Sequence, residues 1–302
     1  MEASRAPTAP AALPAPGVRQ LAGDLLALTK PKVQSLLLLT TVTTMLVAGS
    51  PSIGLILATC IGGYLSAGGA GAVNHWYDRD IDAQMARTAT RPIPAGRIAP
   101  RTALWFGIAL GVLGFAWLTL TANLLAASLS FSGFLGYTLI YTAWLKRRTW
   151  QNIVWGGAAG AVPPLVGWAA VTGGLSGLPI YLFAIVFFWT PPHFWALSLL
   201  MKDEYAKVGV PMLPVVRGEA ETRRQILLYS VLLYAVTQLP FCGGGGLDAI
   251  YLACSLVLGV VFIGLAVALQ RAATRKAALR LYLFSLLYLA LLFVAMVADV
   301  KL

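Results

Sequence analysis

Long apolar stretches alternate along the chain with short polar segments that carry nearly all of its charge. Residues 33–77 run for 45 positions without Asp, Glu, Lys or Arg, and residues 102–145 and 149–201 continue the pattern over 44 and 53 positions. Residues 225–270 contain one charge, Asp248. A membrane-spanning helix needs about 20 predominantly apolar residues, so each stretch is long enough for two spans.

Turn-forming residues divide these stretches into single helices. Residues 277–298 add one last span after the four pairs. The pattern therefore predicts an all-α integral membrane protein with nine transmembrane helices. The expected breaks within the pairs lie at residues 49–51, 121–123, 173–179 and 243–246.

Composition excludes a soluble fold, because charged residues make up 11% of the chain and hydrophobic residues 59%, whereas a soluble domain has about 25% charged residues. The net charge of +11 would suit nucleic-acid binding, but 21 of the 22 basic residues precede span 1 or follow spans 2, 4, 6 and 8. Only Lys301 lies on the other face. This placement explains the charge by membrane topology, so we expect a multi-pass protein of the cell inner (plasma) membrane with no nucleic-acid partner. By the positive-inside rule, the face that carries these basic residues is cytoplasmic. Its N-terminus would be cytoplasmic and its C-terminus periplasmic or extracellular.

The first residues form a separate compositional segment. Residues 1–25 are rich in Ala and Pro and lack the apolar core of a signal peptide. We expect a disordered cytoplasmic tail there, followed by a single transmembrane domain over residues 26–302. The three cysteines lie in apolar runs without CxxC spacing, so no disulfide framework or zinc site is indicated.

Seven of the eleven acidic residues lie in two segments on the expected cytoplasmic face. Asn74, Asp78 and Asp82 follow the spacing i, i+4, i+8, which places them on one face of a helix. The carboxylates of Asp78 and Asp82 on this face repel each other by a few tenths of a kcal/mol unless a cation lies between them. Oxygen ligands with incomplete coordination suit Mg²⁺, which also binds substrate phosphates. We therefore predict that these three residues are catalytic and bind Mg²⁺, with solvated loop charge as the alternative.

Basic residues accompany these acids. Arg87 and Arg91 follow in the same segment, and Lys146 begins a basic triplet after span 4. Arginine pairs bidentately with phosphate oxygens, so we predict that these three residues bind a diphosphate. For Arg147 and Arg148, a role as topology signal alone is an interpretation of the same weight as diphosphate binding. Acidic residues that could bind a metal thus lie beside basic residues that could bind phosphate, and both groups lie at a membrane surface. This combination indicates a lipid-tailed diphosphate as substrate.

The spacing Asn74-x₃-Asp78-x₃-Asp82, followed by Arg87-x₃-Arg91-Pro, resembles the first aspartate-rich motif of the UbiA superfamily of intramembrane prenyltransferases. The resemblance covers the chain from about residue 25 and implies a UbiA-type bundle with Mg²⁺ as cofactor. Stretches around residues 141–153, 189–197 and 203–214 resemble the branch that farnesylates haem. This implies transfer of the farnesyl group of farnesyl diphosphate to a vinyl group of haem B with addition of water. It also implies haem A synthase as a possible partner.

The second acidic segment departs from the superfamily pattern. It reads Asp203-x₃-Lys207 where much of the superfamily has Asp-x₃-Asp. A protonated lysine cannot bind a metal, so a second Mg²⁺ is in doubt. We predict that Asp203 is catalytic and that Lys207 meets a diphosphate oxygen.

The chain has two histidines. His75 lies inside the first motif, and His193 lies in span 6, about 12 Å from its end at 1.5 Å per residue. Polar groups inside membranes are often functional, so we predict that both bind the implied haem, with a packing histidine as the alternative. Pro191 and Pro192 predict a break in the helix before His193.

Three other functions compete with this interpretation. A prenyltransferase for a phenolic ring such as 4-hydroxybenzoate would share the first motif, but Lys207 and His193 argue against it. A transporter would place ionisable residues near the membrane centre, whereas the acids cluster at one rim. A structural haem-binding subunit would explain the histidines but not the shared face of Asn74, Asp78 and Asp82.

Overall fold

The computed structural model describes residues 17–302, and this part of the chain is helical without β-strands. Residues 1–16 of the predicted tail lie outside the described residues. Residues 18–25 of that tail lie in helix α1 (Val18–Leu28), which continues past residue 25. This helix packs against the rest of the protein through the buried side chain of Leu28. A hydrogen bond from Arg97 Nε to Asp24 Oδ1, at 3.0 Å, also holds it in place.

Nine segments of the described chain are long and apolar enough to cross a membrane. The predicted number and all four predicted breaks are confirmed, because the lengths of the apolar runs determine the number of spans and turn-forming residues determine the breaks. The spans are α2 (Pro31–Ala48), α3 (Ile53–Tyr77), α5 (Pro100–Thr121), α6 with η1 (Leu124–Leu135 and Gly136–Leu145), α7 with α8 (Asn152–Gly160 and Val162–Thr172), α9 (Gly177–Leu200), α12 with α13 (Gly218–Thr237 and Leu239–Cys242), α14 (Ala249–Ala272) and α15 (Arg275–Lys301).

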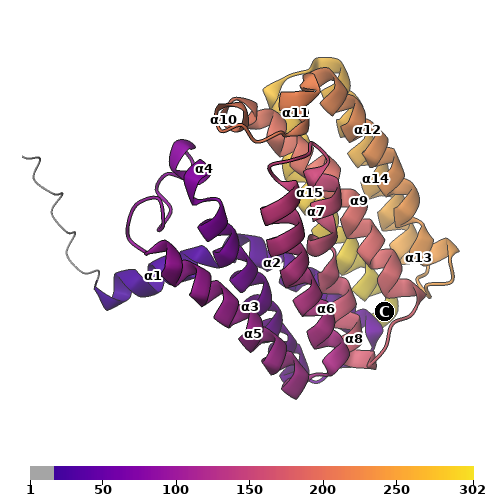
Figure 1. Cartoon of the computed structure of the whole chain (residues 1–302). Coiled ribbons are helices and arrows are strands. Elements are labelled where there is room, and N and C mark those ends of the chain that lie inside the picture. Colours follow the sequence, from indigo (N-terminus) through magenta and orange to yellow (C-terminus); the bar gives the residue numbers. More distant parts are fainter. Residues whose placement is uncertain (1–16) are drawn as a thin grey trace, which may run out of the picture.

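The spans form one closed bundle. Each span packs against the next, and α15 packs against α2, so the last span meets the first. In Figure 1 the short helices α4 (Arg79–Gln84), α10 (Lys202–Lys207) and α11 (Leu213–Val216) lie together at one end, while α13 and the C-terminus lie toward the other. We call the former the loop end; it holds the segments that follow α3, η1 and α9.

Glycines allow close backbone contact between α3 and α5. A Cβ atom at Gly69 would lie 2.6 Å from the carbonyl oxygen of Gly107, and one at Gly107 would lie 2.7 Å from that of Gly69. Small residues allow such backbone contact in membranes, where close packing rather than the hydrophobic effect holds helices together. The contact fixes α3, whose C-terminal turn carries the first acidic motif.

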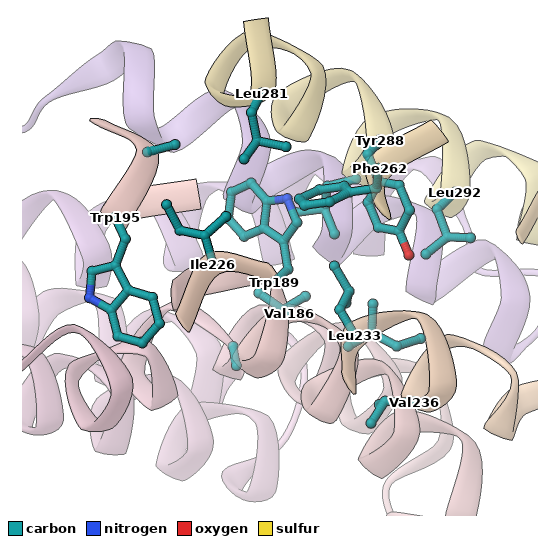
Figure 2. Close-up of a cluster of buried hydrophobic side chains, with 14 of the residues drawn as sticks. Val186, Trp189, Trp195, Ile226, Leu233, Val236, Phe262, Leu281, Tyr288 and Leu292 are labelled. Atoms are coloured by element: carbon teal, nitrogen blue, oxygen red, sulfur yellow. The ribbon is translucent and has the colours of Figure 1, made fainter. Parts of the chain in front are cut away.

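A large apolar core lies among α9, α12, α14 and α15 (Figure 2). Trp189 and Trp195 of α9 are buried in it. Between them, Pro191 and Pro192 lie inside a helix that continues from Gly177 to Leu200, so the predicted break is wrong. Ending a helix within the membrane would leave several backbone groups unsatisfied, at several kcal/mol each. Continuing it loses only the bonds that the two prolines cannot donate.

Candidate active site

The first acidic motif lies where α3 ends and α4 begins. The amide of Asp78 donates to the carbonyl of Asn74 at 2.9 Å, and that of Asp82 to the carbonyl of Asp78 at 2.8 Å, so helical spacing continues across the junction. The three side chains are buried, with exposures of 3% for Asn74, 1% for Asp78 and 3% for Asp82. They share one face, as predicted, and burial excludes the alternative of solvated loop charge.

Each buried carboxylate is paired with a basic side chain. Arg91 Nη1 lies 2.6 Å from Asp82 Oδ2, and Lys146 Nζ contacts Asp78 Oδ2. Asn74 Nδ2 donates to the same oxygen of Asp78 at 2.7 Å. Asp78 Oδ1 is buried and accepts no hydrogen bond from the described residues. The structure thus brings the acidic motif together with Arg91 and Lys146, whereas Arg87 is exposed.

These side chains fit a divalent cation whose ligands come partly from the protein and partly from a substrate. No group of three or more His, Cys, Asp or Glu side chains between residues 17 and 302 could hold a metal alone. Mg²⁺, however, is commonly bound by one or two carboxylates together with substrate phosphates and water. The unbonded Oδ1 of Asp78 and the carboxylate of Asp82 fit that description. Asn74 fits less well, because its Oδ1 accepts from Lys30 and its Nδ2 faces Asp78.

The fourth span ends in a π-helix, η1, which the sequence pattern does not predict. Asn74 Nδ2 donates to Thr142 Oγ1 at 3.1 Å, and the Tyr77 hydroxyl donates to the carbonyl of Ala143 at 3.0 Å. π-Helical turns are rare and often occur at functional sites. Sequence reasoning missed Thr142, although it lies four residues, or one turn, before Lys146.

Lys30 also joins the cluster, although its sequence position indicates only a topology charge. Its Nζ donates to Asn74 Oδ1 at 2.5 Å and to the Tyr137 hydroxyl at 3.4 Å. Burial lowers the pKa of Lys30 to about 8, and the positive charge of Arg91 acts in the same direction. No local pattern could reveal this contact, because 44 residues separate Lys30 from Asn74.

Arg147 joins α4 to the end of η1, so it is more than a topology signal. Its Nη1 and Nη2 donate to the two carboxylate oxygens of Asp80 at 2.7 and 2.6 Å, and Nη2 also donates to the carbonyl of Tyr77 at 3.0 Å. The hydrogen bonds from Arg147 lower the pKa of Asp80 to about 2. This bidentate pair holds α4 against the span that carries Lys146.

The second acidic segment lies in α10, and only part of it turns inward. Asp203 and Lys207 are exposed, so the structure does not bring them into the cluster and their predicted roles remain predictions. Glu204 and Tyr205 are partly buried instead, and Glu204 Oε2 is buried without a hydrogen-bond partner in the described chain. Burial raises the pKa of Tyr205, while the nearby charges of Arg87 and Arg91 lower it. Tyr205 is therefore the α10 residue that approaches these basic side chains.

The two histidines have different surroundings. His193 Nδ1 lies 2.6 Å from Ser285 Oγ, and its ring stacks on Trp189 and Tyr282 with centroid separations of 4.3 and 4.9 Å. Its Nε2 makes no hydrogen bond to the described residues. Both ring nitrogens of His75 are buried and have no hydrogen-bond partner there. His193 of α9 therefore contacts Ser285 and Tyr282 of α15 and has one ring nitrogen without a hydrogen bond to the described residues.

Comparison with known proteins now adds to this geometry. The model of the UbiA prenyltransferase family matches residues 37–294, which include the whole acidic motif and Lys146. The chain belongs to the UbiA prenyltransferase family. The resemblance inferred from the motif spacing is therefore confirmed.

Within the UbiA family, the chain is similar to curated relatives named protoheme IX farnesyltransferase. The relative from Chloroflexus aurantiacus is 54% identical over 94% of this chain and 49% of its own length. The one from Symbiobacterium thermophilum is 53% identical over 93% of this chain and 95% of its own length. The chain thus spans about half the length of several relatives that it matches and nearly all of others.

Solved structures of UbiA-family proteins have the same fold. A digeranylgeranylglyceryl phosphate synthase superposes with a TM-score of 0.76 at 17% identity, covering 93% of this chain and 99% of that protein. A UbiA homologue from Archaeoglobus fulgidus, bound to DMAPP and Mg²⁺, superposes with a TM-score of 0.68 at 17% identity, covering 90% and 99%. The predicted UbiA-type bundle is therefore confirmed.

Proposed function

We propose that this UbiA-family chain transfers the farnesyl group of farnesyl diphosphate to a vinyl group of haem B, with addition of water, to give haem O and diphosphate. The observation that carries the proposal is the cluster in which the buried carboxylates of Asp78 and Asp82 pair with the partly buried side chains of Lys146 and Arg91. It occurs in a chain whose relatives named protoheme IX farnesyltransferase are 51–55% identical to it over at least 90% of its length.

The first chemical event is cleavage of the C1–O bond of farnesyl diphosphate, which leaves negative charge on the diphosphate and an allylic cation. Lys146 and Arg91 supply hydrogen-bond donors to that charge when they exchange their carboxylate partners for phosphate oxygens. Asp78 and Asp82 would hold Mg²⁺, which supplies positive charge that stabilises the leaving group. The Mg²⁺ in the Archaeoglobus fulgidus homologue supports this assignment.

The second event forms the carbon–carbon bond. The terminal vinyl carbon of haem B attacks C1 of the allylic cation, and the positive charge moves to the carbon beside the porphyrin. Water adds to that carbon and releases one proton, leaving a hydroxyethylfarnesyl group. The reaction needs no strong base from the protein, but it needs other water kept away from the allylic cation, which a bundle within lipid does.

The histidines are candidates for the haem contact. We propose that His193 meets haem iron or a propionate through Nε2, because its Nδ1 is engaged by Ser285 and its ring faces are covered. His75 is a second candidate, although both its nitrogens are buried and would need a local shift to reach a ligand. Arg87, Asp203 and Lys207 are proposed to approach the diphosphate only if the exposed loops close over it.

Charge placement supports a cytoplasmic loop end. We propose that the protein lies in the inner membrane with its N-terminus inside and its C-terminus outside. Both substrates are lipid-soluble or amphipathic, so transfer of haem O to a haem A synthase would suit a membrane partner. Copurification of the two enzymes from membranes checks that partnership, and its absence under mild solubilisation would contradict it.

Mass spectrometry of extracted haem tests the reaction directly. Purified protein is incubated with haem B, farnesyl diphosphate and Mg²⁺, with a chelator in the parallel sample. A new haem, heavier by one farnesyl group and one hydroxyl group and absent with chelator, is expected. Unchanged haem in both samples would contradict the proposal, and turnover of a phenolic acid instead would identify a different acceptor.

A further inference from the structure

A groove lies at the loop end, where α3 ends and α5 begins. Its volume is about 780 Å³, within the range of about 300–1,000 Å³ that is typical of ligand pockets. No residue of the candidate active site lines it. Its lining combines two arginines with apolar and aromatic side chains, among them Trp76, Arg79, Pro100, Arg101, Leu104 and Trp105. We call it the arginine–tryptophan groove.

The two arginines carry charge that the protein does not pair. In the described part of the chain, neither Arg79 nor Arg101 lies within ion-pair distance of a carboxylate. Arg79 donates one hydrogen bond, from Nη1 to the carbonyl of Trp76 at 2.7 Å, and its guanidinium lies 5.3 Å from the centre of the Trp76 ring. The adjacent acid, Asp80, is engaged through both oxygens by Arg147. Since each guanidinium has five N–H donors, most donors of the two arginines remain available to an anion.

The groove lies at the level where the spans leave the membrane. Trp76 is the last but one residue of α3, and Pro100 is the first residue of α5. Trp105 follows Pro100 by five residues, about 7.5 Å along the helix at 1.5 Å per residue, and its side chain is 67% exposed. Exposed tryptophans near the ends of spans are typical of the membrane–water interface. The arginines therefore lie at the height of lipid headgroups, with Leu104 and Trp105 on the side toward the acyl chains.

Packing within the protein fixes both walls of the groove. The contact between Gly69 and Gly107 holds α3 against α5, and the two helices are neighbours in Figure 1. On the α3 side, the Trp76 ring packs against a buried apolar cluster that consists of Leu28, Ala72, Ile93, Ile98 and Ala103. The groove is therefore formed before any ligand binds.

We propose that the arginine–tryptophan groove binds an anionic phospholipid, with the lipid phosphate between Arg79 and Arg101 and the acyl chains along Leu104 and Trp105. Arginine pairs bidentately with phosphate oxygens, and basic pockets between transmembrane helices bind anionic headgroups. A zwitterionic headgroup would bring a cation to two unpaired arginines, so charge complementarity favours a headgroup with net negative charge. Such a lipid takes no part in the proposed reaction. Because Arg79 is the first residue of α4, the lipid would stabilise the junction that carries the acidic motif.

Lipid titrations of the purified full chain in detergent test the site. Native mass spectrometry measures the Kd for phosphatidylglycerol and for phosphatidylcholine with the same acyl chains, with inorganic phosphate added as a competitor. Arg79→Gln and Arg101→Gln are made separately and together. The matched control is Arg271→Gln with Arg280→Gln, which removes two exposed arginines that do not line the groove. Arg101 is exposed and makes no hydrogen bond to the described residues, so its variant keeps the fold, and thermal unfolding checks this for every variant.

The wild-type protein is expected to bind phosphatidylglycerol at least about tenfold more tightly than phosphatidylcholine, the effect of one charged hydrogen bond or more. The double groove variant should lose this preference, Arg101→Gln should weaken it several-fold, and the control should keep it. Equal Kd values for the two lipids in the wild type, or an unchanged preference in the double groove variant, would overturn the proposal.

Two further outcomes would assign the groove to another anion. Displacement of phosphatidylglycerol by an equal concentration of inorganic phosphate would make it a site for free phosphate and overturn the lipid proposal. Weaker binding of haem B by the double groove variant, measured by absorbance titration, would assign the arginines to a haem propionate and overturn it as well. Neither result alters the proposed chemistry at the acidic cluster, because none of its residues lines the groove.

Discussion

Asp78 is 1% exposed, and one of its carboxylate oxygens is shared between Asn74 and Lys146. Desolvation offsets much of the attraction within a buried ion pair, so such a pair adds little stability. Binding of a diphosphate explains the arrangement better, because Lys146 can move to phosphate while Asp78 turns to a cation. The same exchange applies to Arg91 and Asp82.

Asp78→Asn tests the role of this carboxylate at nearly constant shape. We expect turnover to fall at least about 100-fold, the scale of losing one preorganised electrostatic group, while haem binding persists. Asp248→Asn, at an exposed position on the other end of the bundle, is the control and should leave turnover unchanged. Activity of Asp78→Asn within a few-fold of wild type would remove Asp78 from the site.

His193→Asn tests the haem contact. Asparagine can retain a partner for Ser285 but lacks an atom at the position of Nε2, so we expect weaker haem binding in absorbance titrations and normal pyrophosphate binding. Ser285→Ala removes the partner of Nδ1 and keeps Nε2, so it should bind haem nearly normally. Equal haem affinity of wild type and His193→Asn would show that His193 only packs.

At the scale of elements, two packing contacts of α3 position the residues around its C-terminal turn. Gly69 lets α5 approach its backbone, and the packing at Gly71 brings in the segment that ends in Lys30. η1 completes the arrangement by bringing Thr142 and Lys146 to the same turn. The site therefore depends on three separate helix contacts rather than on one loop.

Gly69→Ala tests the α3–α5 contact. The added Cβ would lie 2.6 Å from a backbone oxygen, so we expect destabilisation by about 1–3 kcal/mol, measured as a lower Tm in detergent. Gly264→Ala in α14, where nothing lies within 4 Å of a Cβ, should be stabilised by about 0.5–1 kcal/mol. Equal Tm values for the two variants would contradict the proposed contact.

For the whole molecule, an odd number of spans places the two described ends of the bundle on opposite membrane faces. The chain has nine candidate spans between residues 17 and 302, and α15 returns to contact α2. The acidic and basic residues of the site all lie at the loop end, whereas Lys301 at the far end bonds the carbonyl of Gly49 at 2.8 Å.

Fusions to green fluorescent protein test this topology. The fluorescent protein folds and fluoresces in the cytoplasm, but it does not fluoresce when it is exported unfolded to the other side of the membrane. A fusion after Thr274 follows eight spans and is expected to fluoresce, whereas a fusion after Leu302 follows nine and should be dark. The opposite result would invert the proposed orientation. Equal fluorescence of both fusions would mean that α15 does not cross the membrane.

The sequence by itself determined the number of spans, their breaks and the common face of Asn74, Asp78 and Asp82, because apolar length and helical spacing are local properties. It also placed Arg91 and Lys146 near that face through their positions at the ends of spans. The family resemblance followed from the same local spacing.

Only the tertiary structure decided which other side chains reach the site. Lys30 and Thr142 meet Asn74 across 44 and 68 residues, and such contacts depend on how the helices pack. In the short helix α10, packing turned Glu204 and Tyr205 inward and left Asp203 and Lys207 exposed. Likewise α9 continues through Pro191 and Pro192, because a broken helix in the membrane would leave more backbone groups unsatisfied than two prolines do.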